Sequence, residues 1–146
     1  MNAISRYLTQ DHAHCDELFA DTENAVGEHA WESARGLFAR FSNATVRHFL
    51  REEETLFPAF EAQTGMQGGP TFMMRMEHDQ MRDVLVAMEQ ALGREDERAY
   101  LGLSETLLML LRQHNAKEEQ ILYPMCDRAL SGEAEALVQR MADQSA

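Results

Sequence analysis

Apolar residues recur every three or four positions along most of the chain, and polar residues fill the positions between them. This spacing is typical of amphipathic α-helices that bury one face against one another. It predicts four long helices, at about 3–25, 31–62, 71–92 and 97–130, and a short C-terminal helix at about 133–141. Short connections between long helices favour an all-α, up-down-up-down four-helix bundle.

Glycine and proline mark where the predicted helices end or bend. Gly27 follows the first helix, TGMQGGP (64–70) separates the second from the third, and Gly93 closes the third. Pro58 and Pro124 fall inside the second and fourth predicted helices. Because proline lacks an N–H and its ring collides with the preceding turn, we expect a kink or an ending near each of them.

The chain contains an internal repeat with a shift of 66 residues. REEETLFPAF (51–60) aligns with KEEQILYPMC (117–126), and in both halves a second His follows the first by 36 residues. The pairs that carry chemistry are His12 with His78, His48 with His114 and Glu52 with Glu118. We interpret the chain as a single domain, residues 1–146, built from a duplicated helical hairpin in which each half supplies one His and one HxxxE motif.

All six of these His and Glu residues fall on the apolar stripe of their own predicted helix. Residues four apart lie above one another on a helix face, so the His and Glu of each HxxxE motif point to one centre. His14, by contrast, lies about 200° around the helix from His12. Burying imidazoles and carboxylates without partners would cost several kcal/mol for each charge. The pattern therefore predicts that the buried set binds metal ions.

The types of ligand narrow the choice of metal. Mixed nitrogen and oxygen donors suit Fe, Mn or Zn, and the absence of inward cysteine pairs argues against a structural zinc site or an iron–sulfur cluster. Cys15 shares the buried stripe of its helix, but Met81 stands at the matching position of the repeat. We therefore interpret Cys15 as core filling. Cys15 and Cys126 alone do not make a disulfide framework.

The pattern His–HxxxE–His–HxxxE resembles the hemerythrin-like, or HHE cation-binding, family over about residues 4–130. Its most specific pieces are HFLREEETLFP (48–58), MEHDQM (76–81) and HNAKEEQILYP (114–124). The resemblance implies a non-haem pair of Fe ions with an oxo or hydroxo bridge, Zn or Mn being less favoured. It also implies the metal ligands: His12, His48, His78 and His114 as terminal ligands, and Glu52 and Glu118 as bridges between the two ions.

The sequence departs from the oxygen-carrying hemerythrins in two places. Those proteins have a second His on the third helix and HxxxxD on the fourth. Here the positions four residues before and after His78 are Met74 and Arg82, and the fourth helix has HxxxE. The ligand set is closer to the di-iron domain of bacterial proteins that repair iron–sulfur centres, without their Cys-containing N-terminal segment. Of about twelve coordination positions on two irons, these ligands and a bridge leave about one exchangeable position per iron.

Several polar residues near the predicted ligands are not themselves predicted to bind metal. Glu53, Glu54 and Glu119 are expected to be solvated or to support ligands rather than to bind metal. Asp11 and Glu77 each precede a predicted ligand and either orient an imidazole or stand as surface acids.

Six further residues receive no metal role from the sequence. Tyr123 aligns with Phe57 in the repeat, which favours packing over chemistry. His14 and His29 are expected to play no part in metal binding. The methionines at positions 74, 81 and 88 follow a heptad stripe, which favours core packing over a soft-metal site.

Charge and hydropathy exclude several classes of partner. With 13 Lys and Arg against 25 Asp and Glu, the formal net charge is −12, and no basic patch stands out. Nucleic acid and anionic membrane surfaces are therefore not expected partners. No apolar run reaches the ~18 residues of a membrane span, and the start MNAISRYLTQDH does not read as a signal peptide. We expect a cytoplasmic protein.

Three functions fit the predicted centre. The first is an iron protein that binds oxygen, nitric oxide or iron in sensing, storage or stress response. The alternative is a di-iron enzyme that acts on peroxide, nitric oxide or ferrous iron, including iron donation for cluster repair. The third is a structural bundle that holds Zn or Mn. A small diatomic or peroxide ligand is expected, while the sequence leaves open the reaction, whether the chain is an enzyme, and its oligomeric state.

Overall fold

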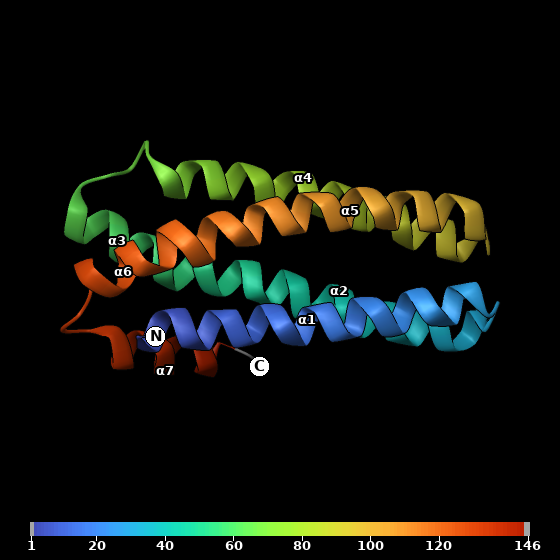
Figure 1. Ribbon diagram of the computed structural model, residues 1–146, viewed down its shortest axis with the longest axis horizontal. Coiled ribbons are helices and arrows are strands. Elements are labelled where there is room, and N and C mark those ends of the chain that lie inside the picture. Colours follow the sequence, from blue (N-terminus) through green and yellow to red (C-terminus); the bar gives the residue numbers. More distant parts are fainter. Residues whose placement is uncertain (1, 145–146) are drawn as a thin grey trace.

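The computed structural model describes residues 2–144 and shows an all-α four-helix bundle with a short additional helix at its C-terminal end (Figure 1). In chain order the elements are α1 (Ala3–Gly27), α2 (Trp31–Arg51), η1 (Glu52–Leu56), α3 (Phe57–Thr64), α4 (Pro70–Gly93), α5 (Glu97–Lys117), η2 (Glu118–Leu122), α6 (Tyr123–Ala129) and α7 (Ala134–Asp143). The expected bundle and its C-terminal helix are confirmed. Within the described range, no helix has the length and apolarity that crossing a bilayer requires.

Two antiparallel hairpins, α1–α2 and α4–α5, make up the bundle and lie side by side (Figure 1). Each hairpin turns through a short connection in which the second residue after the glycine has a left-handed backbone conformation. His29 (φ 57°) and Glu95 (φ 54°) occupy these turns and are 66 positions apart, so the repeat in sequence is also a repeat in backbone conformation. The duplicated hairpin read from the sequence is therefore present in the fold.

The second and fourth predicted helices are not continuous α-helix. Each contains a five-residue π-helical segment, η1 or η2, that begins at Glu52 or Glu118 and ends two residues before Pro58 or Pro124. The wider turn accommodates the proline, which cannot donate to the turn before it and would press on the carbonyl of an ordinary α-turn. The expected disturbance thus precedes each proline as a bulge, after which α3 and α6 continue the path.

Two apolar clusters pack the bundle, one toward each end. The cluster near the hairpin turns includes Phe19, Phe38, Phe41, Met88, Tyr100 and Leu107. The cluster at the opposite end includes Ile4, Leu8, Leu56, Phe60, Leu122, Leu137 and Met141. Met74, Met81 and Met88 are all buried, as their spacing predicted, while Cys15 is only half-buried and Cys126 is fully buried. Along every long helix, the predicted ligands fall between the two clusters.

Asp127 of α6 caps the first turn of α1. Its carboxylate accepts hydrogen bonds from the backbone N–H groups of Ile4 (3.1 Å) and Ser5 (3.3 Å) and from the Ser5 hydroxyl. Asn2 precedes α1 but makes no side-chain cap of its own. The carboxylate therefore satisfies donors that a helix start leaves without partners, and it fixes α1 against the other end of the chain.

Replacing Asp127 by Ala should lower the free energy of unfolding by about 1–2 kcal/mol, since a lost cap leaves the first N–H groups of α1 without acceptors. Urea denaturation of the metal-free protein measures the change. Asp21→Ala removes an exposed acid from α1 itself and is the matched control; its free energy of unfolding should stay within about 0.5 kcal/mol of the wild type. An equal loss in both variants would contradict the capping role.

Candidate metal centre

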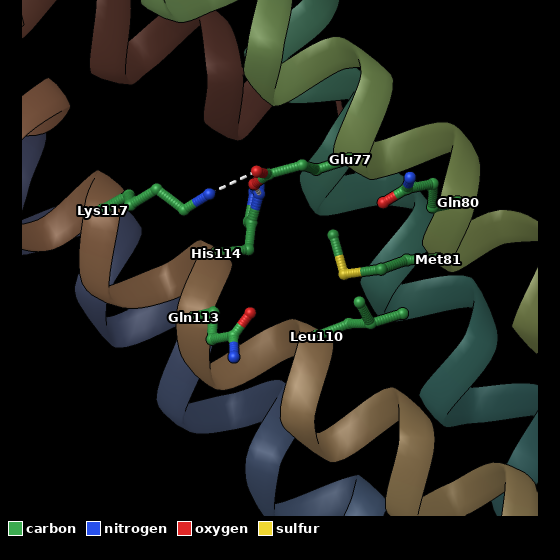
Figure 2. A pocket seen from close by; sticks show the side chains of 7 residues that line it. All are labelled: Glu77, Gln80, Met81, Leu110, Gln113, His114 and Lys117. Carbon is green, nitrogen blue, oxygen red and sulfur yellow. Dashed lines mark hydrogen bonds and ion pairs between the residues drawn. The ribbon is translucent and has the colours of Figure 1, made fainter.

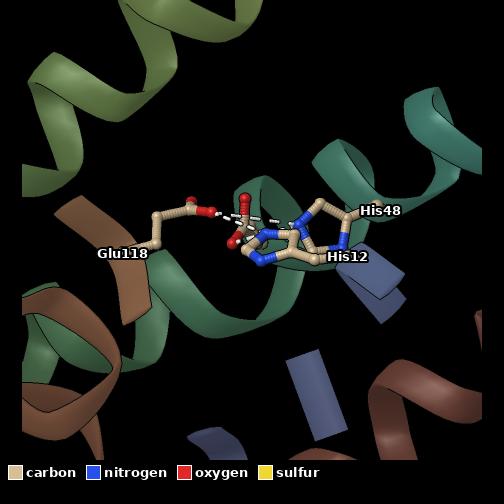
Figure 3. Close-up of side chains that lie close together, drawn as sticks. His12, His48 and Glu118 are labelled. Atoms are coloured by element: carbon tan, nitrogen blue, oxygen red, sulfur yellow. Dashed lines mark hydrogen bonds and ion pairs between the residues drawn. The ribbon is translucent and has the colours of Figure 1, made fainter. Parts of the chain in front are cut away.

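The structure brings all six predicted ligands together in the bundle interior. Two groups form, and within each the potential ligand atoms lie within 4.8 Å of one another. The first half-site consists of His12, His48, Glu52 and Glu118, and the second half-site consists of Glu52, His78, His114 and Glu118. None of the six side chains is more than 5% exposed. Figure 3 shows His12, His48 and Glu118 converging from three different elements.

Both glutamates belong to both half-sites, because each turns one oxygen toward each of them. Glu118 places Oε1 3.0 Å from His12 Nε2 and Oε2 3.1 Å from His114 Nε2. Glu52 places Oε2 3.5 Å from His48 Nε2 and Oε1 3.0 Å from His78 Nε2. A carboxylate shared in this way has the geometry needed to bridge two cations.

A second layer of acids holds the outer nitrogen of every imidazole. The Nδ1 atoms pair as follows: His12 with Glu119 at 2.6 Å, His48 with Asp11 at 2.8 Å, His78 with Glu53 at 2.6 Å and His114 with Glu77 at 2.7 Å. Because Nδ1–H donates to a carboxylate, the neutral ring presents the lone pair of Nε2 to the interior. This is the orientation that a metal-binding histidine requires.

These pairs answer the question that the sequence left open for Asp11 and Glu77. Each acid orients an imidazole, but on the neighbouring helix rather than the histidine that follows it in sequence. Consecutive residues on a helix point about 100° apart, so an acid and the next residue do not share a direction. Glu53 and Glu119 likewise hold histidines of the cluster, His78 and His12, rather than standing free in solvent.

Basic residues close this second layer on its outer side. Arg51 Nη1 lies 2.8 Å from Asp11, and Lys117 pairs with Glu77, the contact drawn in Figure 2 beside His114. Arg51 and Lys117 occupy matching positions of the repeat. The Glu53 carboxylate accepts hydrogen bonds from both His78 and Arg82. Burial raises the pKa of Glu53, but the hydrogen bonds from these two residues outweigh it and hold that pKa at about 2.

Charge within the cluster also raises the pKa of inner histidines, of which His114 and His48 are the clearest cases. Burial lowers the pKa of His114, yet the Glu118 carboxylate more than compensates and raises it to about 9. The pKa of His48 is likewise raised well above its ordinary value, because the Glu52 charge outweighs the effect of burial. In the metal-free chain, protons on these imidazoles balance the two buried carboxylates. A cation that takes the same lone pairs must displace those protons.

The inward polar atoms of the second half-site show that its residues fit a shared cation. Among the described side chains, Glu52 Oε1, His78 Nε2, His114 Nε2 and Glu118 Oε2 are buried and make no well-aligned hydrogen bond, although the two His–Glu pairs lie 3.0 and 3.1 Å apart. These are the four inward atoms of that half-site. A buried polar atom without a partner costs about 1–3 kcal/mol, so four together call for a shared partner. Two imidazole nitrogens and two carboxylate oxygens suit a cation such as Fe, Mn or Zn.

Tyr123 is the site residue that sequence reasoning missed. Its hydroxyl oxygen lies 2.5 Å from Glu52 Oε2, 2.8 Å from Glu118 Oε1 and 3.1 Å from His12 Nε2. In an ordinary α-helix a residue five positions after Glu118 would point about 140° away. The π-helical segment η2 widens the turn, so that Tyr123 comes round to the side of Glu118. Burial and the charges of Glu118 and Glu52 raise the pKa of the phenol well above its usual value.

Aromatic rings line the second half-site where the first has the phenol. Phe49 stacks on His78 with ring centroids 4.1 Å apart and an angle of 16° between planes. Phe57, the repeat partner of Tyr123, lies parallel to His78 at 5.9 Å. The second half-site therefore has an apolar wall of aromatic rings, with Phe57 at the position that Tyr123 occupies in the first.

The remaining histidines lie outside the two half-sites. His14 is exposed on α1, and His29 pairs with Glu97 at the surface. Glu54, next to Glu53, turns outward to Gln144. The structure thus separates neighbouring residues of the same type into those that line the cluster and those that face solvent.

Comparisons with known proteins agree with this arrangement. The sequence model described as "Hemerythrin HHE cation binding domain" matches residues 3–126. Proteins named "Iron-sulfur cluster repair protein YtfE" from Yersinia pestis and Yersinia pseudotuberculosis are 31% identical over 145 residues, which cover 89% of this chain and 64% of those proteins. The chain therefore spans somewhat less than two-thirds of the length of these relatives. No solved structure gave a significant match.

Proposed function

The chain belongs to the hemerythrin HHE cation-binding domain family, and from its geometry we propose that it binds two iron ions, one in each half-site. His12 and His48 are the terminal ligands of the first ion, and His78 and His114 are those of the second. Glu52 and Glu118 bridge the two. The observation that carries this proposal is that each buried carboxylate offers one oxygen to each pair of imidazoles.

Each ion receives four donors from these six residues, two nitrogens and two oxygens. Iron with about six coordination positions keeps about two of them for other donors. Bound iron supplies a Lewis-acidic, redox-active position for a small ligand such as oxygen, nitric oxide or peroxide. The protein's part is to present the Nε2 lone pairs through the outer acids and to exclude bulk water with the apolar clusters at both ends.

A small cavity lies beside one residue of the second half-site and is the place from which we expect such a ligand to approach. It adjoins His114 between α4 and α5 and is drawn in Figure 2. Its lining residues are Glu77, Gln80, Met81, Leu110, Gln113, His114 and Lys117. The polar rim and the Met81 side chain leave room for a ligand of a few atoms rather than an organic substrate.

Iron donation for the repair of iron–sulfur clusters is the second candidate function. The names of the Yersinia relatives favour it, as does a ligand set that leaves positions on iron open to an incoming acceptor. In this role the two half-sites hold iron. The outer acids, through their hydrogen bonds to the imidazole Nδ1–H groups, set the affinity for it. The shared region is the bundle itself, so we assign donation to the bundle.

Protein purified without added metal should contain about two irons per chain, measured by elemental analysis, and its oxidised form should show charge-transfer bands that shift with azide. His48→Ala and His114→Ala should each lower the iron content and the melting temperature together, because both lose a terminal ligand. His14→Ala is the matched control on the surface and should change neither. A colourless wild type with stoichiometric zinc would overturn the assignment of iron.

Glu53→Gln should weaken iron binding by about 10–100-fold, because the amide no longer fixes His78 through a charged acceptor. Competition with a chromogenic chelator measures the affinity. Glu54→Gln changes the adjacent residue, which faces away from the centre, and should leave the affinity unchanged. Equal affinities in the two variants would show that the outer acids do not support the ligands.

Donation can be separated from simple iron leakage. The iron-loaded chain is incubated anaerobically with sulfide, a thiol and the apo form of an iron–sulfur protein, and circular dichroism follows cluster formation. Direct donation should persist when a chelator that captures free ferrous ion is present, whereas an equal amount of ferrous salt should then fail. If the chelator stops both reactions, the chain does not hand iron over directly, while the di-iron assignment itself is unaffected.

A further inference from the structure

The two half-sites differ at one buried oxygen. The Tyr123 hydroxyl lies within 3.5 Å of all four ligand atoms of the first half-site, since His48 Nε2 completes the set at 3.5 Å. The matching position in the second half-site is Phe57. Both rings occupy equivalent places: Tyr123 lies 5.7 Å from the His12 ring, and Phe57 lies 5.9 Å from the His78 ring. Packing alone is thus served by a phenyl ring, and the hydroxyl needs its own explanation.

The distances around the hydroxyl match those between ligands of one ion. Bonds of about 2.0–2.2 Å from a metal to nitrogen or oxygen place adjacent donors about 3 Å apart and opposite donors about 4.2 Å apart. The phenolic oxygen is 2.5–3.5 Å from its four neighbours. His48 Nε2 and Glu118 Oε1 are 4.0 Å from each other, as opposite donors would be. The oxygen therefore stands where an ion in the first half-site would have its fifth donor.

The phenolic proton alone does not satisfy the carboxylates that face the hydroxyl. A phenol has one proton to donate, and the Glu52 and Glu118 oxygens at 2.5 and 2.8 Å both require one. The outer acids Glu119 and Asp11 turn the Nε2 lone pairs of His12 and His48 toward the same oxygen. The one phenolic proton satisfies one of the two carboxylate oxygens, whereas a cation held by the phenolic oxygen and both carboxylates satisfies both.

We propose that the Tyr123 hydroxyl oxygen is a fifth protein ligand of the iron in the first half-site, which makes the two irons chemically different. This assignment rests on the proposed di-iron centre. Tyrosine oxygen is an established ligand of ferric iron in other proteins. When the oxygen–iron bond forms, the phenolic O–H bond breaks and its proton leaves to solvent, with no change of oxidation state.

The assignment has a consequence for where an external ligand binds. The first iron has five protein donors and about one free position, while the second has four donors and about two free positions. The lining of the small cavity between α4 and α5 includes His114 of the second half-site and no residue of the first. Small ligands therefore bind at the second iron, and Tyr123 closes the first.

The test is the electronic and resonance Raman spectrum of the ferric protein, recorded after its iron content has been measured. Tyrosinate bound to ferric iron gives a visible charge-transfer band, and excitation in that band enhances tyrosinate ring vibrations. Both should be present in the wild type and absent from Tyr123→Phe. That variant should fold, since phenylalanine fills the equivalent position at residue 57. Tyr100→Phe, a buried tyrosine in the other apolar cluster, is the matched control and should keep both signals.

A gain-of-function variant makes the test independent of how Tyr123→Phe folds. Phe57→Tyr builds the missing hydroxyl at the second half-site, so the tyrosinate band should become more intense, and azide should perturb the spectrum less. Wild-type protein with two irons per chain and no tyrosinate vibrations would overturn the role of Tyr123 and leave the di-iron proposal standing. Wild-type protein that binds no iron would contradict the di-iron proposal and, with it, this assignment.

Discussion

The fold depends on a layer of buried charge held between two apolar clusters. Four imidazoles and two carboxylates occupy that layer, and each carboxylate faces both pairs of imidazoles. A bundle of this size is stable by a small margin, so such a layer is tolerated only when its polar atoms find partners. The outer acids, the basic residues behind them and a bound cation supply those partners. The buried polar groups that would destabilise the core without partners are therefore also the groups that give it its chemistry.

Much of this arrangement could be predicted from the sequence. Helical spacing located the four long helices, and the repeat with its HxxxE motifs identified six side chains that the structure brings together. Both signals are periodic, and a regular spacing of residues can be recognised in a single sequence. The roles of Asp11 and Glu77 could not be read in this way, because their partners lie on a neighbouring helix and contacts across helices leave no regular spacing.

Tyr123 shows why local helix geometry limits such predictions. The sequence comparison with Phe57 placed the ring correctly but favoured a packing role, whereas the hydroxyl lies among the four polar atoms of the first half-site. Placing that hydroxyl required the π-helical turn of η2, which changes the direction of every residue after Glu118. One widened turn has no hydrophobic signature of its own; the proline that follows it is the nearest indication.

The pairing of the outer acids has a structural consequence for the bundle as a whole. Asp11 and Glu77 join histidines within a hairpin, whereas Glu53 and Glu119 join histidines across the two hairpins. Every one of these contacts maps onto another under the 66-residue shift. Two identical hairpins related by a two-fold axis would consequently recreate the entire set. The covalent chain thus contains the equivalent of a closed symmetric dimer, and joining the halves is what allows them to diverge, with a phenol on one side and a phenyl ring on the other.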